Sequence, residues 1–162
     1  MKKRILVFGG STLCEEKYEQ NTYKCKKNKA FNKIRDKFII DNFSKKSLTS
    51  VESINYLSVF VKSRNYSDCI IDFSESLEIQ NNIIEFEKNL IAIISMLKKN
   101  NIKTILVNPN DFMNNDDYKN IIAKVINNYN VNNIFVDLKI NKDNFIIKNI
   151  NQLNKNILKM CN

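Results

Sequence analysis

The stretch Arg4-Ile5-Leu6-Val7-Phe8-Gly9-Gly10-Ser11-Thr12 decides the fold of this chain of 162 residues. Its apolar part does not alternate with polar residues, which is typical of a strand covered on both faces of a sheet. Gly9 and Gly10 then permit a tight turn. A serine in such a turn at the rim of a sheet is well placed to act as a nucleophile. Ser11 is therefore the first candidate functional residue.

Four more apolar runs are similar to this first strand. The five predicted strands are Arg4–Phe8, Phe38–Ile40, Cys69–Phe73, Thr104–Val107 and Ile134–Val136. Between them, apolar residues spaced three and four positions apart predict helices around 51–61, 83–97, 121–126 and 150–158. Residues 13–36 are mostly polar and are predicted to form a helix plus a loop.

This alternation of strands and helices predicts an α/β fold. We expect a three-layer α/β/α sandwich with a five-stranded parallel sheet of flavodoxin-like topology, formed by residues 1–162 as one domain. Ligands of such sheets gather at the carboxyl ends of the strands. Gly9–Thr12, Ser74–Leu77 and Asn108–Asp111 are therefore expected along one edge of the molecule.

The net charge of +9 is unevenly distributed along the chain. Residues 1–46 hold 13 Lys or Arg and 5 Asp or Glu, so the first third of this basic protein carries most of the excess. Residues 17–46 are thus a candidate contact for an anionic partner. The alternative is a solvated face rich in lysine.

Several classes of site are not expected. The chain contains no histidine, and its four cysteines are scattered without metal-binding spacing, so a metal site is not predicted. Cys69 lies in an apolar run and is expected to be a core thiol. The Gly9–Thr12 turn matches neither the dinucleotide-binding glycine pattern nor a P-loop, so no cofactor is expected.

Nothing in the sequence predicts contact with a membrane. The apolar run after Met1–Arg4 is too short for a signal peptide, and no window approaches the length of a membrane-spanning helix. A cytoplasmic location is the resulting expectation.

The order of these blocks resembles the SGNH (GDSL-like) hydrolase family over nearly the whole chain. The blocks that carry the resemblance are Arg4–Thr12, Ser67–Leu77, Glu85–Lys99 with Ile102–Pro109, Val136–Leu138 and Asp143–Ile146. The resemblance implies an SGNH-like sandwich, with Ser11 as nucleophile and its amide as an oxyanion donor. It also implies that Asp143 belongs to the catalytic set and that Gly9, Gly10, Thr12, Ser74 and Ser76 surround the substrate.

The sequence departs from the family pattern at the positions that carry catalysis. Ser74 stands where the family has a glycine, and Ser76 stands where it has an oxyanion-binding asparagine. A glycine donor expected near Ser47–Thr49 is missing, and Ile146 occupies the histidine position. Only Ser11 and Asp143 remain from the catalytic residues.

Three hypotheses for the function stay open. The first is a pseudoenzyme that keeps the fold, has lost hydrolysis, and binds a small ester or carbohydrate ligand or a protein partner. The second is a residual esterase that uses Ser11 on short acyl or acetyl esters of carbohydrate, with a lysine as its base. The third is a module that binds an anionic partner through residues 17–46.

The candidate residues also have plainer roles. Ser11 could cap a helix that follows it, Gly9 and Gly10 could serve the turn alone, and Asp143 could be a helix N-cap or a surface carboxylate.

Overall fold

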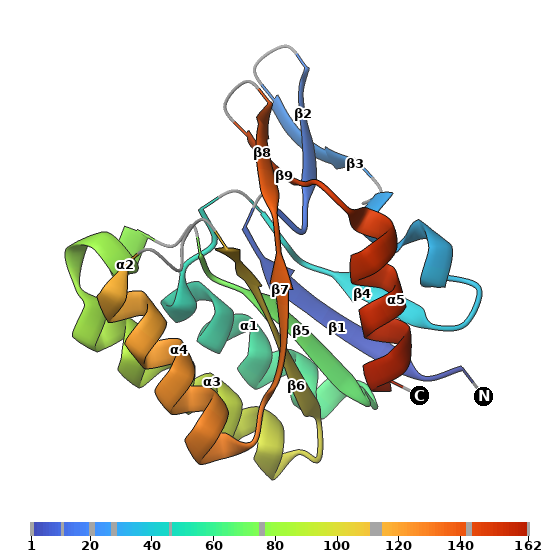
Figure 1. Ribbon diagram of the computed structural model, residues 1–162. Coiled ribbons are helices and arrows are strands. Elements are labelled where there is room, and N and C mark those ends of the chain that lie inside the picture. Colours follow the sequence, from blue (N-terminus) through green and yellow to red (C-terminus); the bar gives the residue numbers. More distant parts are fainter. Residues whose placement is uncertain are drawn as a thin grey trace.

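Strand β1 (Arg4–Gly9) pairs in parallel with one strand on each side, and it is buried from Ile5 onward. Figure 1 shows the computed structural model of the chain. It describes residues 2–10, 12–19, 22–26, 29–45, 47–74, 77–110, 115–141 and 144–161. Of these, residues 15–19, 22–26, 29–30, 77, 139–141 and 144–146 are described by their backbone alone.

The central sheet has five strands, and every neighbouring pair is parallel. In spatial order they are β4 (Ile39–Asn42), β1, β5 (Asp68–Asp72), β6 (Lys103–Pro109) and β7 (Asn132–Val136). Numbered among themselves along the chain, these strands have the order 2-1-3-4-5, which is the flavodoxin-like order. The predicted five-stranded parallel sheet is therefore confirmed.

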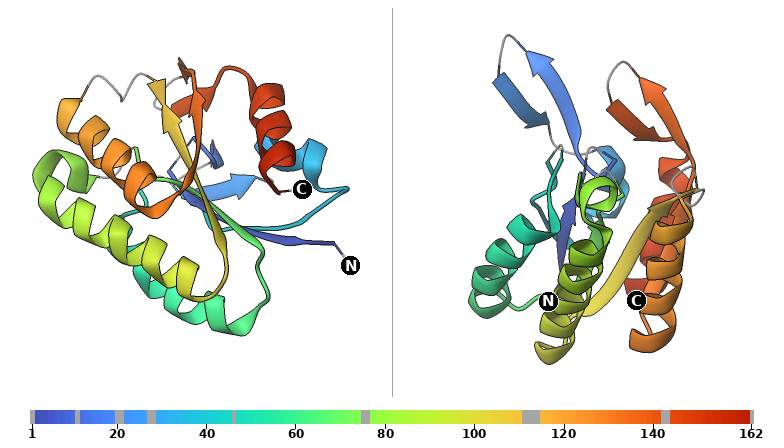
Figure 2. Two further views of the ribbon diagram at one scale, coloured as in Figure 1. Left: turned by 60° about the horizontal axis from the view of Figure 1, so that its bottom comes forward. Right: turned by 90° about the vertical axis from the view of Figure 1, so that its left-hand side faces the viewer.

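Helices cover both faces of this sheet. They are η1 (Lys29–Ile34), α1 (Ser50–Ser63), α2 (Leu77–Asn81), α3 (Ile83–Lys99), α4 (Asp116–Tyr129) and α5 (Ile150–Cys161). Figures 1 and 2 show α1, α3 and α4 on one face, with η1 and α5 on the other. Alternate residues of the three central strands enter the two cores: in β1, Leu6 and Phe8 pack toward the α1–α3–α4 layer, and Ile5 and Val7 toward the α5–η1 layer.

Asparagine residues stand at several helix ends of this chain, which has only two glycines. The side chains of Asn82 and Asn115 accept hydrogen bonds from the first turns of α3 and α4. Asn101 and Asn130, which follow the same two helices, have φ values of 56° and 53°. Asparagine tolerates this left-handed conformation better than other non-glycine residues. The frequent asparagines thus have local structural roles.

Two β-hairpins differ from what the sequence predicted. Residues 13–36 do not form a helix plus a loop: the described part forms an antiparallel hairpin of β2 (Glu15–Glu19) and β3 (Thr22–Lys26), followed by η1. A second hairpin joins β8 (Leu138–Asn141) to β9 (Asn144–Ile147). Figures 1 and 2 show both hairpins projecting from the same end of the molecule. The strands β2 and β3 contain no apolar run, and the short run Phe145–Ile147 in β9 gave no strand prediction.

One carboxylate ties the amino-terminal parts of the fold together. Asp41 Oδ2 accepts hydrogen bonds from Arg4 Nη1 (2.8 Å), Arg64 Nη1 (2.7 Å) and Tyr66 Oη (2.8 Å). Burial raises the pKa of the Asp41 carboxyl, but the three donors outweigh burial and hold that pKa below its ordinary value. Burial and the contact with Asp41 raise the pKa of Tyr66 to about 12. Asp41 therefore acts as a charged junction between β1, β4 and the segment before β5.

We expect Asp41→Asn to lower the free energy of unfolding by roughly 1–2 kcal/mol near neutral pH, since hydrogen bonds to a charged group are lost. The folded-state pKa is lowered, so the contribution of Asp41 is fully present above the unfolded value of about 3.9. It is lost as the pH falls through the folded-state pKa, and the difference between the two proteins should shrink there. Urea unfolding of both proteins across this pH range measures the difference in their free energies of unfolding.

The exposed Asp36 provides the matched control. Asp36→Asn should change the free energy of unfolding by no more than about 0.5 kcal/mol, as is usual for surface substitutions. Equal effects of the two substitutions would contradict the role given to Asp41.

Candidate active-site edge

The candidate site lies at the carboxyl edge, which is the edge of the sheet formed by the carboxyl ends of its parallel strands. Gly9, at the end of β1, is paired with Asp72, at the end of β5. The Gly10 amide donates to the Asp72 carbonyl oxygen (3.1 Å), and the Leu13 amide donates to the Gly10 carbonyl oxygen (3.3 Å). The strand order reverses between β1 and β5, and ligands of such sheets bind at that point.

The close approach of Leu13 and of the Asp72 backbone explains why residue 9 is a glycine. A Cβ atom on Gly9 would lie 2.8 Å from Leu13 Cδ1 and 3.2 Å from the Asp72 carbonyl oxygen. Leu13 is fully buried, so its side chain has little room to move away. Gly9 is thus required by close packing, as well as by any function of the turn.

A buried carboxylate joins the two turns. Asp72 Oδ2 accepts a hydrogen bond from Thr12 Oγ1, and Asp72 Oδ1 accepts from the Ser74 amide (2.9 Å) and from Ser74 Oγ (2.6 Å). All three residues are buried, and Asp72 is only 1% exposed. Both carboxylate oxygens of Asp72 therefore take part in the hydrogen bonds that join the two turns.

The fold brings together four of the predicted site residues. Gly9, Gly10 and Thr12 meet Ser74 around Asp72, as expected for carboxyl ends of adjacent strands. Asp72 itself was not predicted. The available signal was a charged residue inside the apolar run Cys69–Phe73, a position that a buried carboxylate takes only when it is hydrogen bonded.

Three predicted site residues, Ser11, Ser76 and Asp143, lie outside the described residues. The alternative role of Ser11 as a helix cap is wrong, because strand β2 and not a helix follows at Glu15. Asp143 is not the N-cap of the last helix either. That helix starts at Ile150, and the side chain of Asn149 accepts the hydrogen bond from the Gln152 amide (3.0 Å).

A lysine does lie close to the turn, but it is paired. The Lys45 amide donates to the Gly9 carbonyl oxygen (2.9 Å), and Lys45 Nζ lies 2.6 Å from Glu52 Oε1. The hydrogen bond to Glu52 raises the pKa of the Lys45 ammonium and lowers the pKa of the Glu52 carboxyl. Lys45 therefore stays protonated and cannot serve as a general base.

The loop after β4 is built to start helix α1. Thr49 accepts a hydrogen bond from the Glu52 amide, and Glu52 accepts one from the Thr49 amide, which is a capping box. No glycine is present here, yet Ser47 adopts a φ of 57°, in the left-handed region that glycine favours. The turn has kept a glycine-like backbone conformation without the residue that adopts it at least cost.

A second group of polar side chains lies along β6 and β7. Tyr118 Oη donates to Asn108 Oδ1 (2.7 Å), and Asn108 Nδ2 donates to Asn133 Oδ1. Burial and the nearby charge of Asp72 raise the pKa of the Tyr118 phenol well above its ordinary value. Tyr118 is therefore a protonated donor and not a base. At the exposed rim, Asn110 Nδ2 donates to Asp137 Oδ1 (2.7 Å).

The described cysteines are of two kinds. Cys14, two residues after Thr12, is disulfide-bonded, which the sequence analysis did not predict. Cys69 and Cys161 carry free, buried thiols, and Cys69 is a core residue as predicted. Spacing along the chain gave no sign of the bond at Cys14.

Other features of the described residues do not add to this site. A cavity of about 500 Å³ opens at the opposite, amino edge, where Lys98, Lys103 and Tyr129 are among its lining residues. Among the residues that the structure describes, no cluster of histidine, cysteine or acidic side chains could hold a metal ion. None of the described helices is long and apolar enough to cross a bilayer.

Thr12→Val should lower the free energy of unfolding by roughly 1–3 kcal/mol, because it removes a buried hydrogen bond to Asp72 while nearly conserving volume. Thr12→Ser keeps the hydroxyl and should cost less. Urea unfolding of the two variants measures the difference. Equal stability of the Val and Ser variants would show that the hydroxyl does not hold the two turns together.

Comparison with known proteins agrees with this geometry. No family model and no curated protein matches the chain. Among solved structures, TesA has a TM-score of 0.72 at 12% identity, over 97% of both chains. Esterase EstA from Pseudoalteromonas sp. has a TM-score of 0.69 at 12% identity, over 98% of this chain and 96% of that one.

A third similar structure is AlinE4, described as an SGNH-hydrolase family esterase. It has a TM-score of 0.65 at 16% identity, over 83% of this chain and 76% of that one. At such identities the likeness concerns the fold. The five-stranded parallel sheet with its flanking helices is in agreement with that likeness. This chain has the fold of the SGNH (GDSL-like) hydrolases.

Proposed function

We propose that this chain is a pseudoenzyme of SGNH fold, which has lost ester hydrolysis and acts by binding a ligand or a partner. One observation carries the proposal: the whole chain contains no histidine, which is the usual general base for a serine nucleophile. A serine hydroxyl is a weak nucleophile until a neighbouring group accepts its proton.

The described groups near the turn offer no replacement for that base. Asp72 already accepts hydrogen bonds at both carboxylate oxygens. Lys45 is held protonated by Glu52, and Tyr118 is a buried phenol with a raised pKa. Lys45 and Tyr118 therefore keep their protons, and Asp72 is committed to the hydrogen bonds that join the two turns.

The size of the loss supports the proposal. General-base assistance is typically worth ~10²–10⁴-fold in rate. Losing one oxyanion donor costs roughly another 10²–10³-fold. Such effects are not additive, so the factors cannot be multiplied. Either loss alone would leave Ser11 with little of the ordinary rate enhancement of this fold.

The ligand expected for such a protein is a small ester or carbohydrate bound at the carboxyl edge. Ser74 and Thr12 lie at that edge, and the hairpins β2–β3 and β8–β9 project beyond it (Figure 2). The similar structures TesA, EstA and AlinE4 include two described as esterases. The alternative is therefore a residual esterase that acts on short acyl or acetyl esters of carbohydrate through Ser11.

The cytoplasmic location stays a prediction, and one observation counts against it. Cys14 is disulfide-bonded, and disulfides are rare in proteins of a reducing cytosol.

A panel of short-chain p-nitrophenyl esters and acetylated sugars separates the two functions. We expect the native protein to give no turnover above that of Ser11→Ala, because the chain has no histidine to accept the serine proton. A fluorophosphonate probe should likewise leave Ser11 unlabelled, since it reacts only with an activated hydroxyl. Turnover or labelling that disappears in Ser11→Ala would establish the residual esterase instead.

A further inference from the structure

The fold places two basic segments from opposite ends of the chain side by side. Helix α5 packs against η1, and Figures 1 and 2 show the two helices together on one face of the sheet. Lys3 Nζ donates to the Cys161 carbonyl oxygen (2.6 Å), which joins the start of the chain to the end of α5. Residues 2–3, 29–37 and 148–161 thus form one surface, which we call the basic face.

The basic face carries a nearly uniform positive charge. Its described, exposed lysines besides Lys3 are Lys2, Lys33, Lys37, Lys148, Lys155 and Lys159. The sequence of these segments contains a single acidic residue, Asp36. The ion pairs found among the described residues join Arg4 and Arg64 to Asp41, Lys45 to Glu52, and Lys124 to Glu87. None of them involves the six lysines named above.

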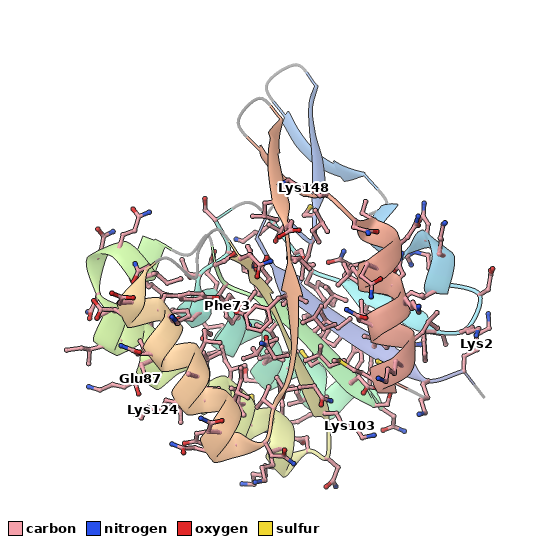
Figure 3. The ribbon with its side chains drawn as sticks, viewed as in Figure 1. Lys2, Phe73, Glu87, Lys103, Lys124 and Lys148 are labelled. Carbon is pink, nitrogen blue, oxygen red and sulfur yellow. The ribbon has the colours of Figure 1, made fainter. Side chains whose placement is uncertain are left out.

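The opposite helix layer has mixed charge. Glu52 on α1, Glu87 on α3 and the first turn of α4 are acidic. Figure 3 shows Glu87 beside Lys124 on this side of the sheet, away from Lys2 and Lys148. The excess charge of the protein is therefore concentrated on the α5–η1 side.

The side chains exposed on the basic face indicate which class of partner this surface suits. The large apolar side chains that are exposed in the described residues lie outside the basic face, with Ile39 just beyond it, so it has no wedge for a lipid bilayer. The sequence of α5 contains no aromatic residue on which a base could stack. Its outer side instead alternates lysine with amides, such as Asn151 and Gln152, and lysines and amides are common donors to phosphate oxygens.

We infer that the basic face binds the phosphate backbone of double-stranded nucleic acid without reading its sequence. Helix α5 is about 18 Å long, which spans several phosphates along a duplex. This surface differs from the predicted segment 17–46: it takes Lys33 and Lys37 from it and adds the lysines of α5. Lys45 lies elsewhere, in its pair with Glu52. The inference does not depend on whether Ser11 is catalytic.

Fluorescence anisotropy with a labelled duplex DNA of mixed sequence tests the inference on the full chain. We expect binding that weakens between about 50 and 200 mM salt, with a slope of log affinity against log salt of about −0.9 for each neutralised phosphate. The double variant Lys155→Gln with Lys159→Gln should weaken binding roughly tenfold or more at the lower salt, and should reduce the slope by about one for each lysine.

The matched control changes the same charge on the opposite layer. Lys62→Gln with Lys119→Gln replaces exposed lysines of α1 and α4, and binding should stay within about twofold of the native protein, since these lysines lie far from the duplex. Circular dichroism melts verify that both double variants are folded. Equal weakening by the two double variants, binding that ignores salt, or no binding would each overturn the inference. So would binding to polyglutamate or to phosphatidylserine vesicles with no binding to duplex DNA.

Discussion

The Asp72 carboxylate is the group on which the arrangement of the site depends. It ends strand β5 and is almost fully buried, and a buried carboxylate is tolerated only when donors surround it. Those donors are Thr12, from the turn after β1, and Ser74, from the turn after β5. The contacts that make the burial possible therefore also bring the two turns together. The carboxylate that organises this edge therefore has a structural role in joining the two turns.

Most of the fold could be predicted because the central strands are buried on both faces. Burial on both faces produces the uninterrupted apolar runs of β1, β5 and β6, and the shorter runs in the partly exposed edge strands β4 and β7 also marked true strands. The hairpin β2–β3 could not be found in this way, since its short strands pair only with each other. Gly9, Thr12 and Ser74 were predicted near one another from topology alone. Asp72 was missed because its role comes from a hydroxyl 60 residues away in sequence.

The persistence of this fold in a chain without histidine has a simple physical basis. The two cores are formed by tens of apolar side chains, and exchanges among such residues are tolerated if volume and pattern are kept. Similar structures at 12–16% identity are consistent with this tolerance. A catalytic base, by contrast, is one residue at one position. Its loss leaves the packing of the sheet intact, so fold and activity can separate during divergence.

Electrostatic interactions within helix α5 do not by themselves explain the lysines of the basic face. Lys159 lies in the last turn of α5, where a positive charge interacts favourably with the helix dipole. Lys155, four residues earlier, repels it by a few tenths of a kcal/mol. Lys148 precedes the first turn of the same helix, where the dipole disfavours a cation. Helix electrostatics thus account for Lys159 alone, and contact with an external anion would stabilise all three.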